Sequence, residues 1–284
     1  MAKIKQKVES VGVPLKDWDI SINRGILTGY NDAFIIDEET KNALVAADSK
    51  SADIIRPILR GRDIKKYGFE NQNRWLIFIP WHFPLHNNPE IVGASELAEK
   101  AFKEQYPAVY SHLEKYKDHL KKRNKAETGI RYEWYVLQRW GAKYWEDFSK
   151  QKIMYPNMTK YLPFYLDTCA YMQNDKSFMI TGKHLSYLTA FLNSSLFKYC
   201  FSDNFPELQG GTRELRKIFF DKIPVKQVSD KTDAMFAKYI LEVQERKKNN
   251  LDTKSLEIEI DQLIFEIYEL TLEERSEIGF IDII

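Results

Sequence analysis

The residues of this chain that could do chemistry are mostly basic side chains placed near glycines and aromatic rings. Five cations fall between Arg56 and Lys66, on both sides of Gly61. Three more follow one another from Lys121 to Arg123. Because Lys and Arg side chains and backbone amides are the groups that bind phosphate, these clusters predict contacts with a polyanion.

A second basic region is interleaved with aromatic residues. Between residues 131 and 160, cations alternate with tyrosines and tryptophans. Base edges in the major groove of DNA are read by Arg, Lys, Asn and Gln, so the loops around Arg139 and Lys143 and around Asn157 and Lys160 are predicted to read bases. The predicted phosphate contacts are Arg60, Arg62, Lys65, Lys66, Lys121, Lys122, Arg123 and Arg131.

The same residues have a simpler interpretation. Cations from Lys121 to Lys125 follow a helical pattern, and basic residues at the end of a helix are stabilised by its dipole. The aromatic residues could be core, and the cations between them solvated. Composition alone leaves DNA binding and a solvated surface both open.

The charge of the chain is unevenly distributed. The net charge is only +1, which by itself argues against a strong polyanion binder. Residues 100–160, however, hold 14 Lys and Arg against seven Asp and Glu, and residues 251–284 hold two against ten. A basic middle and an acidic end can cancel in the total while one face of the protein stays positive.

The motifs of several enzyme classes are absent from the sequence. A methyltransferase needs a glycine-rich cofactor turn, and one acting on adenine N6 also needs an Asn-Pro-Pro-aromatic loop; neither occurs, nor does a P-loop. Asp147 and Lys150 are neighbours in sequence without a strand geometry suited to a metal nuclease. His82 and His86 lie in a proline-containing loop without a nearby cysteine, so loop histidines are favoured over a zinc site. We therefore expect no catalytic residue, cofactor or metal site in this chain.

Composition favours a folded, cytoplasmic protein. Hydrophobic residues make up 44% of the sequence, and only two cysteines occur, which fits a reducing compartment. No apolar run reaches the roughly 20 residues that span a bilayer, and no apolar segment typical of a signal peptide follows the first basic residues. We expect no membrane partner.

Hydrophobic periodicity predicts a mixture of strands and helices, hence an α+β fold. Apolar residues at helical spacing predict helices over residues 94–105, from residue 107 onward, over 184–202, and throughout the region after 228. Short apolar or aromatic runs predict strands at 33–36, 74–80, 133–140, 152–158, 163–172, 177–182 and 217–225.

The acidic end of the chain carries an apolar stripe. The stripe is formed by Leu256, Ile260, Leu263, Ile264 and Ile267, and it is wide enough to need a partner surface. Acidic residues repel phosphate, so this helix is expected to pack on the rest of the chain or on another subunit. Thr271 and Glu274 have the spacing of a capping box that begins a further helix.

In its order of short segments, nearly the whole chain resembles the TaqI-like C-terminal specificity domain. No single motif is specific; their order and spacing together carry the resemblance. The matching residues are Gly25, Thr28, Gly29, Asn31, Ala33 and Phe34; Pro57 to Ile64; Trp75 to Ile77; Tyr106, Pro107, Leu113, Leu120 and Arg123; Lys152 and Ile153; Leu192 to Ser194; Gly210 and Gly211; Ile223 and Pro224; and Glu259 to Glu274.

The resemblance implies a DNA target-recognition domain of a bacterial restriction–modification enzyme. In such enzymes the domain is joined to an adenine-N6 methyltransferase and often to an endonuclease. S-adenosylmethionine and Mg²⁺ are therefore expected only for the catalytic parts, which this chain lacks. The implied partners are double-stranded DNA and the methyltransferase or endonuclease domain.

The resemblance also implies a division of the chain. We expect a lead-in segment at residues 1–14, a recognition domain at 15–228 built on a mixed β-sheet with inserted helices, and a helical C-terminal region at 229–284. The alternatives are a specificity subunit of a multisubunit restriction system, a protein-interaction scaffold without DNA contact, and a nuclease in its own right.

Overall fold

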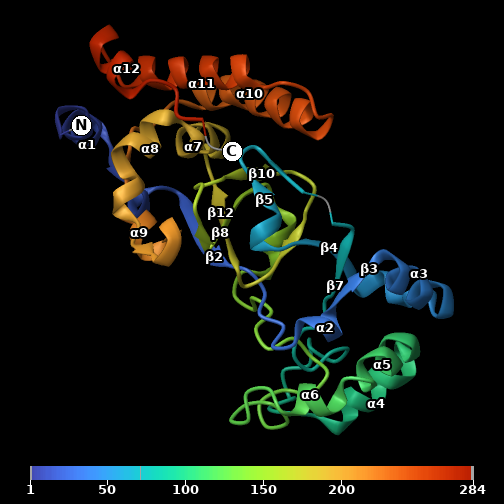
Figure 1. Ribbon diagram of the computed structural model, residues 1–284. Coiled ribbons are helices and arrows are strands. Elements are labelled where there is room, and N and C mark those ends of the chain that lie inside the picture. Colours follow the sequence, from blue (N-terminus) through green and yellow to red (C-terminus); the bar gives the residue numbers. More distant parts are fainter. Residues whose placement is uncertain (1, 71, 283–284) are drawn as a thin grey trace.

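The computed structural model describes residues 2–70 and 72–282, which form helices and several small sheets around two main hydrophobic cores (Figure 1). The α+β prediction is confirmed. The first core is built on an antiparallel sheet of β2 (Ile20–Arg24), β8 (Lys152–Pro156), β10 (Tyr165–Asp167) and β12 (Ser177–Gly182), in the order β10-β8-β12-β2. Strand β8 is buried along its whole length because it has a neighbour on each side and packed layers on both faces.

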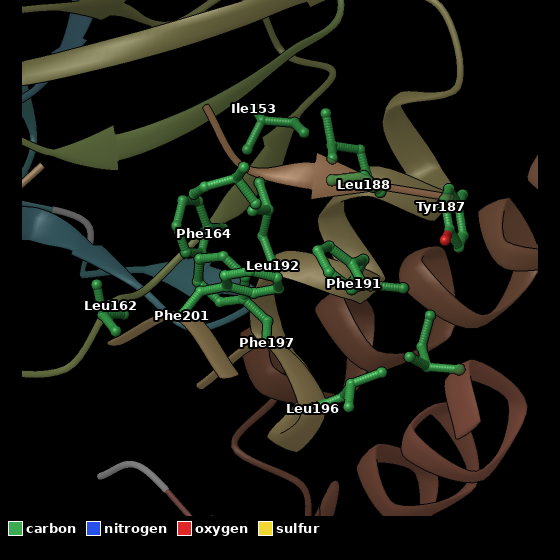
Figure 2. Close-up of a cluster of buried hydrophobic side chains, with 14 of the residues drawn as sticks. Ile153, Leu162, Phe164, Tyr187, Leu188, Phe191, Leu192, Leu196, Phe197 and Phe201 are labelled. Carbon is green, nitrogen blue, oxygen red and sulfur yellow. The ribbon is translucent and has the colours of Figure 1, made fainter. Parts of the chain in front are cut away.

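Helices cover this sheet in two layers. The inner layer contains α7 (Leu185–Asn193) and α8 (Ser195–Phe201); the outer one contains α10 (Asp230–Lys248), α11 (Lys254–Ile267) and α12 (Leu272–Ile278), with α1 (Ala2–Val11) at the edge (Figure 1). All nine residues of α7 are buried because the helix lies between the sheet and α10. Figure 2 shows how Leu188 and Phe191 of α7 gather with Ile153 of β8 and with Phe164.

The C-terminal helices therefore pack on the rest of the chain, as one of the two outcomes expected for the acidic end. Leu256, Ile260 and Ile264 of its apolar stripe are buried in the first core. The capping box of α12 is confirmed, since the Thr271 side chain accepts from the Glu274 backbone N–H and Glu274 accepts from that of Thr271.

The second core is built on a sheet in the order β11-β4-β7-β3. Its strands are β3 (Ile35–Asp37), β4 (Ile55–Leu59), β7 (Arg74–Ile77) and β11 (Met172–Gln173). The helices of this half are α2 (Asn31–Phe34), α3 (Glu38–Ala47), α4 (Glu96–Gln105), α5 (Pro107–Glu114) and α6 (Lys117–Lys121). Strand β11 comes from far along the sequence and pairs parallel with β4, so it ties the two halves together.

Short elements complete the fold. The paired strands are β1 (Val13–Pro14) with β15 (Pro224–Val225), β5 (Ile64–Lys65) with β6 (Gly68–Phe69), and β14 (Thr212–Glu214) with both β9 (Met158–Thr159) and β13 (Glu207–Leu208). The short helical segments are η1 (Leu15–Asp17), η2 (Ser49–Ile54), η3 (Gly61–Asp63), η4 (Trp145–Ser149), η5 (Ser202–Asn204), η6 (Gln209–Gly211) and α9 (Lys217–Phe220). None of the helices described is long and apolar enough to cross a membrane.

Several predicted elements are corrected. The strand predicted at 33–36 begins as the end of α2, and the strand predicted at 163–172 is divided between β10 and β11, which lie in different sheets. Residues 133–140 form buried turns rather than a strand, because their backbone groups bond to other segments: Leu137 N–H donates to the Ile79 carbonyl, and the Trp134 carbonyl accepts from a side chain. The predicted strand at 217–225 begins as the helical turn α9. The predicted helix over 184–202 is broken at Ser194, whose extended backbone and side chain begin α8.

The first core joins segments from both sides of the proposed domain boundaries. Ile4 and Val8 of the lead-in segment, and Phe236 and Ile260 of the helical C-terminal region, share the first core with β8 and β12. The second core is formed largely by residues 26–148, inserted between β2 and β8. The boundaries proposed at residues 14 and 228 therefore fall within one core.

Candidate nucleic-acid interface

A cavity of about 500 Å³ opens at the meeting point of four chain segments. Strand β5 and the turn η3 supply one wall, the β8–β9 region and Thr212 of β14 the other, and the end of α10 closes it. Its lining residues are Gly61, Arg62, Ile64, Lys65, Lys66, Pro156, Met158, Thr159, Lys160, Tyr161, Pro163, Thr212 and Lys247. Among the described lining residues five are cations and none is an Asp or Glu, so we call this cavity the basic groove. A concave surface of one charge concentrates ions of the opposite sign.

The first wall is fixed by a tight turn around Gly61. The Asp63 carboxylate accepts from the Arg60 backbone N–H at 2.8 Å and from Arg60 Nε at 3.0 Å and Nη2 at 2.9 Å. The Gly61 N–H donates to Asn174 Oδ1, and a Cβ on Gly61 would lie 2.2 Å from the Lys176 carbonyl oxygen. The turn is therefore packed closely against the sheet, and Arg62 extends from it into solvent.

The predicted phosphate contacts of this segment differ in how free they are. Arg62 is exposed and its guanidinium has no ion pair within the described part of the chain. Lys65 is half exposed and lies 3.2 Å from Glu70. Arg60 is engaged by Asp63 and largely covered. Arg62 and Lys65 are thus the cations that this wall presents to a ligand.

The prediction for Lys66 is corrected. Its side chain is 9% exposed, and its ammonium lies 2.5 Å from Glu257 Oε2 of α11. A buried ammonium is stable only when its charge is paired. Lys66 therefore belongs to the floor of the basic groove and is not an open phosphate contact.

The opposite wall follows the end of β8. Strand β9 pairs with β14, and beyond it the Tyr161 N–H donates to Thr159 Oγ1, which turns the chain outward. Lys160 is exposed at this turn, and its ammonium has no ion pair among the described residues; Met158 and Tyr161 beside it are also more than half exposed. The structure thus brings the predicted Lys160 and Arg62 into the lining of one groove, although about 100 residues separate them in sequence.

Asn157 takes a different place. Its backbone N–H and carbonyl are used by Lys176 and Leu215 respectively. The side chain does not line the basic groove, and its Oδ1 is buried without a partner. Asn157 lies next to the groove wall without forming it.

Two further predicted cations meet in the other half of the molecule. Glu127 accepts from Arg139 Nη2 at 2.8 and 3.0 Å and from Arg131 Nη1 at 3.0 Å. Both guanidinium groups lie over the ring of Trp81, 5.6 and 5.9 Å from its centre. The hydrogen bond from Arg139 lowers the pKa of Glu127 below its ordinary value. Two half-exposed arginines are thereby held side by side as a pair.

Three of the other predicted cations in this half of the molecule are exposed lysines. Lys121 and Lys122 are exposed at the end of α6, and Lys143 is exposed after the turn at Gly141; among the described residues none of these three ammonium groups has an ion pair.

Arg123, by contrast, is buried, which corrects its prediction as a phosphate contact. Its guanidinium donates to the carbonyls of Leu120, Thr28 and Trp134. Burial lowers its pKa to about 10.

The sequence did not point to Lys247 of α10 as part of the groove. Lys247 belongs to a run of charges, from Glu245 to Lys248, that reads as an ordinary solvated helix end. Only the packing of α10 against β6 places it at the groove. Its membership depends on tertiary contacts that no local pattern records.

Comparison with known proteins gives consistent matches. A family model described as the TaqI-like C-terminal specificity domain matches residues 56–225. The Type II methyltransferase M.MjaIV of Methanocaldococcus jannaschii is 21% identical over 249 residues, covering 84% of this chain and 76% of its own length.

Two solved structures share the fold. The Type IIL restriction-modification enzyme MmeI, solved in complex with DNA, has a TM-score of 0.61 at 12% identity, covering 94% of this chain and 37% of that one. The type IIG restriction endonuclease BpuSI has a TM-score of 0.51 at 13% identity, covering 94% and 33%. This chain spans about a third of each of these enzymes.

Proposed function

Because this chain belongs to the family of TaqI-like C-terminal specificity domains, we propose that it recognises a DNA target sequence on behalf of a restriction–modification enzyme. The observation that carries the proposal is the basic groove, whose lining contains Arg62, Lys65 and Lys160. The family model matches residues 56–225, and this stretch includes both walls of the groove with Arg62, Lys65 and Lys160.

In the proposed complex the groove holds the DNA backbone. Arg62, Lys65 and Lys160 present charge on two sides of a concave surface, which suits phosphates. The exposed ring of Tyr161 and the side chain of Met158 lie at the same rim and supply apolar contact to bases or sugars. Phosphate contacts fix the register of the protein on the duplex, and base contacts give the sequence.

The arginine pair and the remaining exposed cations would extend the contact. Arg131 and Arg139 are held together by Glu127, and Lys121, Lys122 and Lys143 lie in the same half of the chain. We assign base reading to the loops carrying Arg139, Lys143 and Lys160, with Asn157 behind the last of them. Held side chains suit base reading because their geometry is set before binding.

The chemistry would belong to the partner domain. We propose that a methyltransferase domain, with or without an endonuclease, takes the target adenine out of the duplex and methylates its N6. Support comes from the match to a Type II methyltransferase. S-adenosylmethionine and Mg²⁺ would bind that partner, and this chain would supply only recognition of the DNA target sequence.

The experiment compares two double variants of the full chain. Arg62→Ala with Lys160→Ala removes one free cation from each wall; Lys50→Ala with Lys231→Ala removes two exposed lysines that do not line the groove. Duplex affinity is measured across a range of salt concentrations. Each lost phosphate contact lowers the slope of log K against log salt by roughly 0.9, so the groove variant should lose about 1.8 and the control nothing. Equal slopes in the two variants would remove the groove from the interface, and no duplex binding by the unmodified chain would favour the scaffold alternative.

A further inference from the structure

We infer that the C-terminal helices are part of the DNA-binding surface: Lys247 of α10 contacts the DNA backbone, and Glu257 of α11 positions Lys247 for that contact. The inference rests on the proposed function and extends it beyond residues 56–225, where the family model ends. The acidic helix α11 would then hold a phosphate-binding lysine in place through its Glu257 carboxylate.

The end of α10 is fixed beside the basic groove. One turn before Lys247, the Gln244 side-chain amide bonds both the N–H and the carbonyl of Leu166 in β10, each at 3.1 Å. Lys247 itself packs on the β5–β6 hairpin, where a Cβ on Gly68 would lie 3.9 Å from its own Cβ. Lys247 lines the groove, whereas the next residue, Lys248, is exposed and does not.

One carboxylate faces two ammonium groups at this place. Glu257 is 7% exposed; its Oε2 lies 2.5 Å from Lys66, and its Oε1 lies 3.0 Å from Lys247 and accepts from Thr253 Oγ1 at 2.7 Å. Burial alone would raise the pKa of Glu257, but the Lys66 ammonium and these hydrogen bonds together lower it. The side chain is thus held ionised.

Lys66, Lys247 and Glu257 together carry two positive charges and one negative charge, which leaves one positive charge in excess. Lys66 is buried and Lys247 is 31% exposed, so the excess faces the groove at Lys247. Lys198 and Asp261 lie behind this group: the Lys198 ammonium donates to the Asn193 carbonyl, and Asp261 accepts from the Ser195 N–H. Lys247 is therefore a cation that is held in one position and open to solvent on one side, as a phosphate site requires.

A matched pair of adjacent lysines provides the test. In the full chain, Lys247→Ala should lower the salt slope of duplex binding by roughly 0.9, the value of one phosphate contact. Lys248→Ala removes the same charge one residue further on and should leave the slope unchanged. If the two variants have the same slope while Arg62→Ala with Lys160→Ala lowers it, this inference fails and the proposed function stands. If the groove variant is also without effect, the proposed function fails as well.

The role of Glu257 is tested by whether Glu257→Gln strengthens or weakens duplex binding. Glu257→Gln adds one positive charge next to the groove, so a carboxylate that only neutralised charge would, once removed, give tighter binding and a steeper slope. A positioning carboxylate gives the opposite result: weaker binding despite the added charge, because Lys247 is no longer held. Tighter binding by Glu257→Gln overturns the positioning role.

Discussion

Replacing Arg123 by methionine tests whether one cation of a basic cluster belongs to the interior. Methionine keeps much of the length of the side chain and removes its hydrogen bonds. In the folded chain the guanidinium donates to the Leu120 carbonyl at 3.0 Å, to Thr28 at 2.6 Å and to Trp134 at 2.7 Å. The last two acceptors join the start of the second core to its buried turns.

The expected loss of stability follows from these three bonds. A hydrogen bond to a charged group contributes about 1.5–3 kcal/mol, and a buried carbonyl left without a partner costs about 1–3 kcal/mol. Part of this loss is offset because the guanidinium is no longer desolvated, the same effect that lowers its pKa to about 10. We expect Arg123→Met to lower the free energy of unfolding by about 3–5 kcal/mol.

Urea denaturation measures this change. With a slope of about 3 kcal/mol/M, the midpoint should fall by about 1–1.7 M without a change in slope. Lys122→Met, at the exposed neighbouring position, should leave the midpoint where it is. If Arg123→Met keeps the midpoint and instead lowers the salt slope of DNA binding by roughly 0.9, Arg123 is a phosphate contact and does not belong to the interior.

Two further predictions concern buried charges. The ionised form of Glu257 is favoured in the folded chain, so its contribution to stability is complete above its unfolded pKa, near 4.5, and is lost as the pH falls through the lower folded value. Urea midpoints measured from pH 6 to pH 3 should therefore fall more steeply for the unmodified chain than for Glu257→Gln, and parallel curves would refute this. Lys152 and Asp167 form a fully buried ion pair, so Lys152→Met, which leaves the carboxylate alone, should cost about 3–5 kcal/mol. Lys150→Met, at an exposed position, is the control, and a loss of equal size there would contradict the assignment.

The secondary structure that the sequence predicted correctly is the part governed by local pattern. Most of the strand predicted at 152–158 forms β8, which ends at Pro156, and residues 177–182 form β12. Both are short apolar runs, and such a run predicts a buried strand whichever strand lies beside it. Residues 133–140 are also rich in apolar and aromatic side chains, yet they form turns, because their backbone groups bond to Ile79 and Arg123 rather than to a neighbouring strand.

The candidate site was predictable only in its pieces. The sequence predicts Arg62 and Lys160 as DNA contacts because each is a cation near glycine or aromatic residues. Their presence in one groove depends on where the fold places β5 and β9. Lys122 and Arg123 are adjacent cations that the sequence does not distinguish. In the structure the Arg123 guanidinium is buried and donates to the carbonyls of Thr28 and Trp134. Lys247 carried no local signal at all.

Selection from a random library shows whether this chain recognises a DNA sequence. The full chain is incubated with duplexes that contain a randomised segment, at near-physiological salt, and the bound fraction is sequenced. We expect one short sequence to be enriched over successive rounds, and affinity for it to fall steeply with added salt. A bound fraction with no enriched sequence, or an absence of duplex binding, would contradict target recognition by this chain.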